Sequence, residues 1–172
     1  MQSKTNITRQ TVDLSGFPDL VVIYLGMKAR SVRGFLTVLS FGPRISAAVA
    51  QKPPGLLRHE PFVFSIFPLH VGMRQYWRDF DSLETWARSL PHQKWWQDFV
   101  KDPGGTGFWH EVYLMRGGME GVYADLNLPP VGFQGFAPSL PAHGGMFSAR
   151  QRLRLAGETP AQPSGVAESD LG

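Results

Sequence analysis

The sequence contains no cysteine among its 172 residues, which excludes disulfides, thiolate metal sites, iron–sulfur clusters and cysteine nucleophiles. A cofactor would therefore need histidine, tyrosine, methionine or carboxylate ligands. Charged residues make up only 18% of the chain, and the 17 Lys and Arg exceed the 14 Asp and Glu by a net charge of +3. Because a nucleic-acid site normally needs a concentrated stripe of Lys and Arg, we expect no nucleic-acid partner.

Long hydrophobic runs are also missing. The longest apolar stretches, residues 20–27 and 32–41, are shorter than the roughly 18 residues that a membrane helix needs. Residues 1–12 contain Lys4 and Arg9 but no apolar stretch, so they do not resemble a secretory signal peptide. We therefore expect a cytoplasmic protein with no membrane partner.

Several catalytic signatures are absent as well. The glycine-rich stretch at 104–107 is followed by no lysine, which argues against a phosphate-binding P-loop. His59 and His110 are each followed by a glutamate, as in a zinc-protease helix, but neither has a second histidine four residues on. No serine sits in a G-x-S-x-G elbow. The sequence therefore predicts none of these hydrolase or nucleotide-binding sites.

The chain is rich in apolar residues, 42% of the total, in patterns typical of strands and helices. Ser31 and Asp81 are suitable helix N-caps, and Gly42-Pro43 and Pro91 are expected to interrupt the two helices. The predicted elements are a strand at 20–25, a helix at 32–50, strands at 61–68 and 73–80, a helix at 81–101, and strands at 108–115 and 120–124. This order predicts an α+β fold on the split βαβ or ferredoxin-like plan, with one added strand.

Three of the predicted strands, at 20–25, 61–68 and 108–115, are apolar on both faces. Helices can cover only one face of such a sheet, so the other face needs a second sheet or a ligand. The sequence therefore predicts a homodimer whose sheets cover an apolar pocket. Residues 153–172 have small residues and prolines without apolar periodicity, so we expect a disordered tail there.

The most informative segment is residues 106–114. On a strand alternate side chains share a face, so Phe108, His110 and Val112 point one way and Trp109 and Glu111 the other. His110 is then a lone histidine among apolar neighbours. If buried, it needs a hydrogen-bond partner or a metal, because an unpaired buried polar group costs about 1–3 kcal/mol. It is either a core histidine bonded to a main-chain carbonyl or the ligand of a cofactor metal.

Other polar residues are weaker candidates. Arg74 and Arg78 share a predicted strand face, and they lie either at a pocket rim or at a solvated strand end. His143 lies in a loop between proline and glycine. The tryptophans are expected in the core. The remaining histidines are expected to be structural or solvated, with His59 and His70 in turn-prone segments and His92 near a helix end, where it can cap terminal carbonyls.

The longer motifs resemble those of a known family. They are Gly-Phe-Trp-His-Glu-Val-Tyr at 107–113, Glu-Gly-Val-Tyr at 120–123, Pro-Pro-Val-Gly-Phe at 129–133 and Ser-Ala-Arg-Gln-Arg-Leu at 148–153. These motifs resemble the small dimeric α+β-barrel proteins described as monooxygenase-like, which include a fungal fumagillin-pathway monooxygenase. The similarity runs over residues 12–152, where we place the domain.

The resemblance implies a dimeric α+β barrel that encloses a pocket. The family is also similar to antibiotic-biosynthesis monooxygenases and to phenylacetaldoxime dehydratases, which carry haem. In the haem-containing relatives a histidine on a late strand is the proximal ligand, so the resemblance makes His110 the candidate metal ligand. Phe108 and Val112 would then be cofactor-binding neighbours, and the candidates for a distal catalytic group are Arg74, Arg78 and His143.

Three functions remain open. The first is an oxidoreductase that acts on a hydrophobic small molecule, with oxygen activated at haem or by the substrate itself. The second is a haem-dependent lyase resembling aldoxime dehydratase. The third is a non-catalytic haem or ligand carrier, because fold alone does not establish a reaction. The two haem enzymes share His110 as their expected iron ligand.

Overall fold

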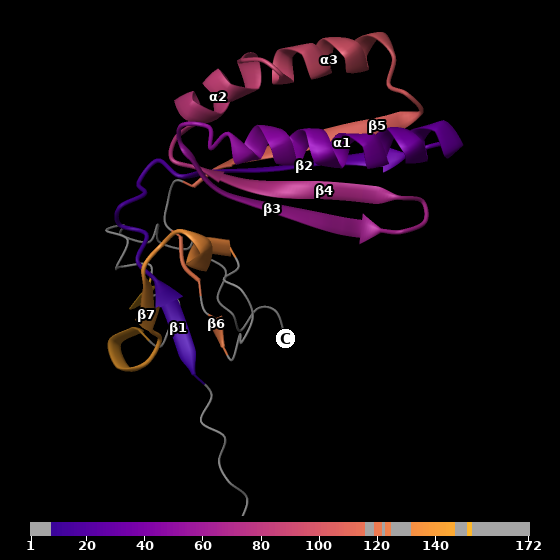
Figure 1. Cartoon of the computed structure of the whole chain (residues 1–172). Coiled ribbons are helices and arrows are strands. Elements are labelled where there is room, and N and C mark those ends of the chain that lie inside the picture. Colours follow the sequence, from indigo (N-terminus) through magenta and orange to yellow (C-terminus); the bar gives the residue numbers. More distant parts are fainter. Residues whose placement is uncertain (1–7, 116–118, 122, 125–131, 147–150, 153–172) are drawn as a thin grey trace, which may run out of the picture. The chain divides into compact units, whose positions relative to one another are not determined.

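The computed structural model (Figure 1) describes residues 8–115, 119–121, 123–124, 132–146 and 151–152. The described residues fall into two compact units, one within Asp19–Met115 and one within Met1–Pro18 and Arg116–Gly172. The predicted tail at 153–172 lies outside the described residues. None of the described helices is long and apolar enough to cross a membrane.

The larger unit is an antiparallel four-stranded sheet with helices on one face (Figure 1). Its strands are β2 (Val21–Ala29), β3 (Leu56–Ser65), β4 (His70–Trp77) and β5 (Thr106–Leu114), in the order β3-β4-β2-β5. Its helices are α1 (Val32–Ala50), α2 (Phe80–Arg88) and α3 (His92–Lys101). This confirms the predicted ferredoxin-like α+β plan, with the second helix divided in two at Pro91.

Several predicted boundaries are wrong by a few residues. The β3–β4 hairpin turns at residues 66–69, where the Ser65 hydroxyl donates to the Pro68 carbonyl at 2.6 Å, so both strands lie earlier than predicted. Helix α2 starts after Asp79 instead of at Asp81, because the Asp79 carboxylate accepts from the Ser82 N–H at 2.7 Å. Helix α1 continues through Pro43 without the predicted interruption. A proline removes only one backbone donor, and the other turns of this long helix remain bonded.

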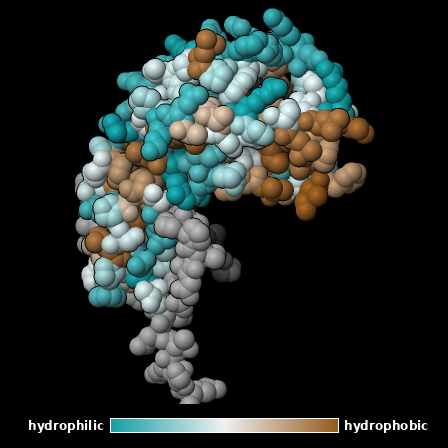
Figure 2. Space-filling model, viewed as in Figure 1, coloured by the Kyte–Doolittle hydropathy of each residue, from teal (hydrophilic) through white to brown (hydrophobic). Residues whose placement is uncertain are grey.

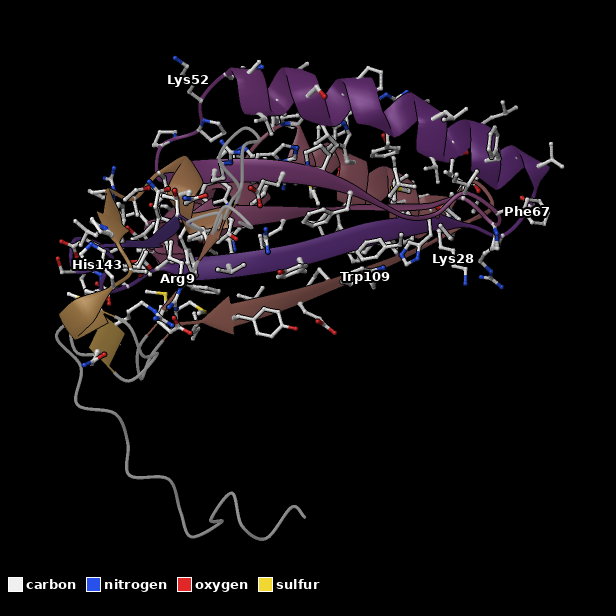
Figure 3. All side chains as sticks on the ribbon, turned by 90° about the horizontal axis from the view of Figure 1, so that it is seen from below. Arg9, Lys28, Lys52, Phe67, Trp109 and His143 are labelled. Carbon is white, nitrogen blue, oxygen red and sulfur yellow. The ribbon has the colours of Figure 1, made fainter. Side chains whose placement is uncertain are left out.

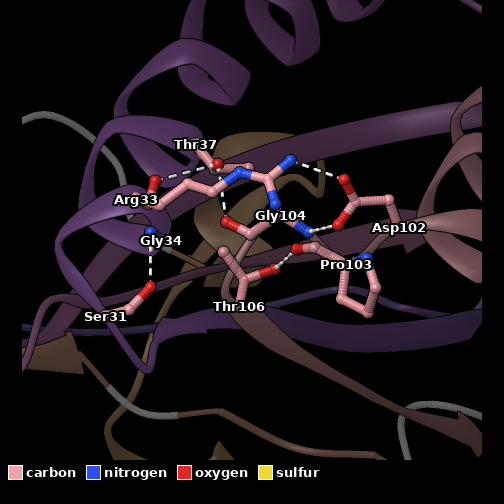
Figure 4. Close-up of polar contacts among 8 residues, drawn as sticks. All are labelled: Ser31, Arg33, Gly34, Thr37, Asp102, Pro103, Gly104 and Thr106. Atoms are coloured by element: carbon pink, nitrogen blue, oxygen red, sulfur yellow. Dashed lines mark hydrogen bonds and ion pairs between the residues drawn. The ribbon is translucent and has the colours of Figure 1, made fainter.

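The start of α1 is held against the loop that precedes β5 (Figure 4). The Ser31 hydroxyl caps the helix by accepting from the Gly34 N–H at 3.1 Å, which confirms the predicted N-cap. One turn later the Thr37 hydroxyl donates to the Gly104 carbonyl at 2.9 Å. The Gly34 Cα lies so close to this loop that a Cβ there would overlap the Gly105 carbonyl. This contact fixes α1 across the sheet edge formed by β5.

Two small core clusters lie under the helices. One contains Val21, Trp77 and Leu83, and the other contains Ala29, Val38 and Leu69. They join β2 to α2 and to α1 respectively. The helices are therefore anchored by two separate clusters, with space left for a cavity.

The smaller unit contains the sheet β6-β1-β7, formed by β1 (Arg9–Val12), β6 (Tyr123–Ala124) and β7 (Ser139–Pro141). The short 3-10 helices η1 (Gly132–Gly135) and η2 (Gly144–Met146) complete its described elements. The predicted strand at 120–124 is therefore shorter than expected and pairs with β1 instead of extending the main sheet. Sequence reasoning missed β1, because a four-residue strand in a polar arm has too little periodicity to detect.

Candidate functional site

The main feature of the larger unit is a cavity of about 830 Å³ between the helices and the sheet. This volume is within the range of about 300–1,000 Å³ that is typical of small-molecule sites. The wall is largely apolar, and its aromatic members include Phe41, Trp86, Trp95, Trp96, Phe99 and Phe108. The sequence analysis expected a pocket on the face away from the helices, and the tryptophans in the core. This cavity lies on the helix side instead. Trp77 is in the core as expected, whereas Trp86, Trp95 and Trp96 from α2 and α3 line the cavity.

Strand register determines which residues face this cavity. His59, Gln75, Ile23 and Val112 form one cross-strand row, and Pro61, Met73, Leu25 and His110 form the neighbouring row. All eight residues line the cavity. Because side chains alternate along a strand, the residues between these rows point to the opposite face of the sheet.

His110 lies on β5 opposite Leu25, and Phe108 and Val112 line the cavity beside it. This confirms the prediction that the three residues share one face of β5, and the structure shows that this face is the one towards the helices. His110 is exposed on an edge strand, so the alternative of a core histidine bonded to a main-chain carbonyl does not apply. Its imidazole packs edge-on against Phe108, with ring centroids 5.8 Å apart. Among the described residues it has no hydrogen-bond partner, so its nitrogens remain available to a ligand.

His59 reaches the same cavity from the opposite edge strand, β3. The sequence placed it in a turn-prone segment, and the structure places it inside a strand. Its Nδ1 lies 3.2 Å from the amide nitrogen of Gln75. The amide oxygen of Gln75 in turn accepts from the indole N–H of Trp77 at 3.2 Å. Burial lowers the pKa of His59 from its ordinary value, an effect that the nearby Glu60 carboxylate opposes.

His92 is the third histidine of the cavity and the first residue of α3. It cannot cap terminal carbonyls, as the sequence analysis expected, because the N-terminal end of a helix presents N–H groups. Its ring packs between Trp86 and Trp95, with centroids 3.7 and 4.8 Å away. Nδ1 is buried without a partner among the described residues. Burial lowers the pKa of His92 from 6.5 to about 4, so the ring is neutral near pH 7.

The two predicted arginines do not line the cavity. Arg74 lies on the opposite face of the sheet, where its guanidinium donates to Glu60 at 2.6 Å and to the Tyr24 hydroxyl at 2.9 Å. Arg78 is exposed beyond the end of β4, so the strand face it was expected to share with Arg74 does not extend that far. His143 is exposed in the smaller unit. Within the larger unit, neither Arg74 nor Arg78 is among the residues that line the cavity.

The face of the sheet away from the helices is aromatic (Figure 3, with Trp109 labelled). Trp109 donates from its indole nitrogen to His70 at 2.9 Å, and Phe64 stacks on the His70 ring. Gly26 and Gly72 make room for this cluster, since a Cβ at either glycine would clash with Trp109 or Phe64. No described helix covers this face.

A second apolar surface lies where α1 begins and the β3–β4 turn ends (Figure 2). Val32 is 82% exposed there and Phe67 96%. Leu39 and Val63 are also more than half exposed, and both belong to the cavity wall. Two exposed apolar residues of this region therefore also belong to the cavity wall.

These features define a ferredoxin-like α+β protein with an aromatic cavity between its helices and its sheet. The family model described as Monooxygenase af470-like matches residues 20–133. The chain belongs to this family. The match includes every residue of the cavity wall and confirms the resemblance seen in the sequence motifs.

Aldoxime dehydratases are also similar to this chain. Aliphatic aldoxime dehydratases of Rhodococcus erythropolis and Rhodococcus globerulus are each 32% identical over 94 residues, which are 52% of this chain and 27% of the relative. A crystal structure of aldoxime dehydratase in complex with butyraldoxime superposes with a TM-score of 0.66 at 20% identity, over 91% of this chain and 47% of its own. The superposition shows that the two proteins share a fold. The matched part is about a quarter of the length of the curated relatives and about half of the solved chain.

Proposed function

We propose that the protein is a monooxygenase-like enzyme that acts on a neutral, apolar small molecule. The observation that supports this most is the cavity of about 830 Å³, with aromatic walls and three histidines. An apolar pocket with a few polar groups is the usual form of a small-molecule site. Membership of a monooxygenase-like family favours oxidation as the reaction.

Haem is the cofactor that the resemblance implies, and the cavity residues fit it. Neutral imidazole is a good iron ligand, and His110 lines the cavity without a protein partner among the described residues. Phe108 and Val112 would provide apolar contacts beside His110. The described lining residues include no Lys or Arg, so they offer no cation to the carboxylates of haem. When bound, haem supplies an iron centre that activates oxygen.

A hemin titration of the purified protein tests this assignment. We expect a histidine-ligated Soret band that His110→Ala weakens at least tenfold in affinity. His70→Ala is the matched control, because His70 lies on the same sheet but does not line the cavity. Loss of the band in His92→Ala instead of His110→Ala would reassign the ligand. If the wild-type protein binds no hemin, the cofactor-free form of the proposal replaces the haem form.

The second candidate function is dehydration of an aldoxime to a nitrile. The observation that favours it is the 32% identity to aliphatic aldoxime dehydratases over 94 residues. Incubation of the hemin-loaded protein with butyraldoxime, followed by chromatography for butyronitrile, tests it directly. Nitrile formation without oxygen consumption would favour the lyase. Binding of apolar ligands with neither reaction would favour a non-catalytic carrier.

We also propose that the protein is a homodimer that closes a barrel through the face of the sheet away from the helices. No element of the larger unit covers the Trp109 cluster on this face, and Tyr113, on the same face of β5, is 46% exposed. The match covers 47% of the solved aldoxime dehydratase chain, so that chain is about twice as long as its matched part. A second copy of this chain would supply an equivalent amount of structure.

A further inference from the structure

The cavity contains one hydrogen-bonding group whose proton position is fixed by its neighbours. An indole N–H can only donate, so the Trp77 N–H, 3.2 Å from Gln75, must point at the amide oxygen. The amide nitrogen of Gln75 then faces His59 Nδ1 at 3.2 Å, with the sulfur of Met73 at 3.8 Å as its other contact. An amide nitrogen cannot accept a hydrogen bond, so Nδ1 must be the acceptor. The neutral ring of His59 therefore carries its proton on Nε2.

This arrangement resists reversal. Gln75 and Trp77 are both completely buried, at 0% exposure. Rotating the amide would bring two N–H groups together at Trp77 and leave that buried indole without a partner. Protonation of Nδ1 would likewise oppose the amide N–H, and burial already lowers the pKa of His59. The hydrogen bonds from Trp77 to Gln75 and from Gln75 to His59, on the adjacent strands β4 and β3, therefore fix the Nε2–H tautomer of His59.

The Nε2–H group has no partner among the described residues, and the His59 ring lines the cavity. The other residues of the cavity wall indicate which kind of ligand can accept a hydrogen bond from this Nε2–H group. Among the described lining residues Glu84 is the charged carboxylate, and it pairs with Arg88 at 2.7 Å. With no cation in that wall to pair with an anion, a charged acid is disfavoured as a ligand. The aromatic side chains favour a ring-containing body.

We propose that His59 is the specificity-determining residue of the cavity, donating from Nε2–H to the oxygen acceptor of a neutral, ring-containing ligand. The preferred class is an aromatic molecule with a carbonyl oxygen. This inference rests on the proposed function, since it assumes that the cavity binds apolar molecules. Gln75 is the positioning residue, because it acts only through the tautomer of His59.

A matched ligand pair tests the proposal on the purified protein. 2-Acetylnaphthalene carries a carbonyl oxygen, and 2-isopropenylnaphthalene has the same shape without an acceptor. We measure both dissociation constants by quenching of tryptophan fluorescence, since Trp86, Trp95 and Trp96 line the cavity. The quantity compared is the ratio of the two constants, because differences in ligand hydration cancel between protein variants.

We expect His59→Phe to reduce the preference for the ketone by about three- to tenfold, the equivalent of one hydrogen bond, with little change for the alkene. His59→Gln restores a side-chain N–H and should recover part of the preference. His70→Phe is the control, because His70 lies on the same sheet but does not line the cavity, and it should keep the preference. An unchanged ratio in His59→Phe would overturn the proposal while leaving the proposed function intact. Failure of both ligands to bind the wild-type protein would overturn the proposed function, and this inference with it.

A second measurement needs no folded variant. The imidazole nitrogen NMR spectrum of the wild-type protein distinguishes the two neutral tautomers, and we expect an Nε2–H ring whose signal moves with the ketone but not with the alkene. If every neutral imidazole is in the Nδ1–H form, or if the Nε2–H signal ignores the ketone, the proposal is wrong.

Discussion

At the scale of single residues, the buried imidazole of His92 in the cavity wall makes the free energy of unfolding depend on pH. Burial lowers its pKa from 6.5 to about 4 in the folded protein. Between these values the unfolded chain binds a proton that the folded chain does not. The contribution of His92 to stability is therefore present above about pH 6.5 and is lost as the pH falls towards 4.

We expect His92→Phe to flatten the fall of the free energy of unfolding between about pH 7 and pH 4.5. Urea unfolding curves at several pH values measure this slope. His143→Gln serves as the control, because His143 is exposed and its removal should leave the slope unchanged. An identical slope in His92→Phe and the wild type would mean that His92 is not held neutral by burial.

The predicted site residues show how far single positions can be predicted. The two-residue period of a strand was enough to predict that Phe108, His110 and Val112 share one face of β5. His59 and His92 were misplaced because their roles depend on partners 16 residues away at Gln75 and on tryptophans packed in space. No local signal marks such partners. The best available signal was the presence of histidine itself in a chain without cysteine.

At the scale of elements, the N-cap of α2 can be tested, because the sequence predicted Asp81 and the structure has Asp79. We expect Asp79→Ala to lower the free energy of unfolding by about 1 kcal/mol, because it removes the N-cap acceptor. Asp81→Ala, at the predicted cap, removes only an acidic residue from the first turn. It should lower the free energy of unfolding by less, at most about 0.3–1 kcal/mol. Chemical denaturation of both variants measures the difference. Equal losses would show that the Asp79 carboxylate contributes nothing specific.

The contact between α1 and the loop before β5 gives a second test at this scale. A Cβ at Gly34 would overlap the Gly105 carbonyl, and neither backbone segment can move freely. We expect Gly34→Ala to destabilise the protein by about 1–3 kcal/mol or more, as overpacking does. Gly42→Ala, in the same helix, meets nothing within 4 Å, but a Cβ before Pro43 opposes the gain in helix propensity, so it should change stability little. Thermal unfolding should therefore shift strongly downwards only for Gly34→Ala.

The elements themselves were largely predictable. Ser31, Pro91 and the apolar runs gave the order of strands and helices, because caps, prolines and periodicity act locally. The ends of β3 and β4 were wrong because the Ser65 hydroxyl closes a turn that hydrophobicity alone does not mark. The separate pairing of β6 with β1 depends on chain segments more than 100 residues apart.

At the scale of the whole molecule, assembly is the remaining prediction. We expect a particle of twice the chain mass of 19.1 kDa in multi-angle light scattering. Tyr113→Lys places a charge on the uncovered face of the sheet and should shift the equilibrium towards monomer. Leu90→Lys is the control, since Leu90 is 73% exposed in the connection between α2 and α3. A wild-type mass of one chain at micromolar concentration would contradict the dimer.

The ferredoxin-like order of elements and the alternation of side chains along β5 could be predicted from the residues alone, since both depend on residues close together in the chain. The lack of cysteine likewise limited possible metal ligands to other side chains. The position of the cavity under the helices, and its sharing by His59, His92 and His110, became visible only in the folded chain. These histidines come from β3, α3 and β5, and only strand register and helix placement bring their side chains to one cavity. The tautomer of His59 likewise exists only because the folded sheet aligns Trp77, Gln75 and His59 side by side.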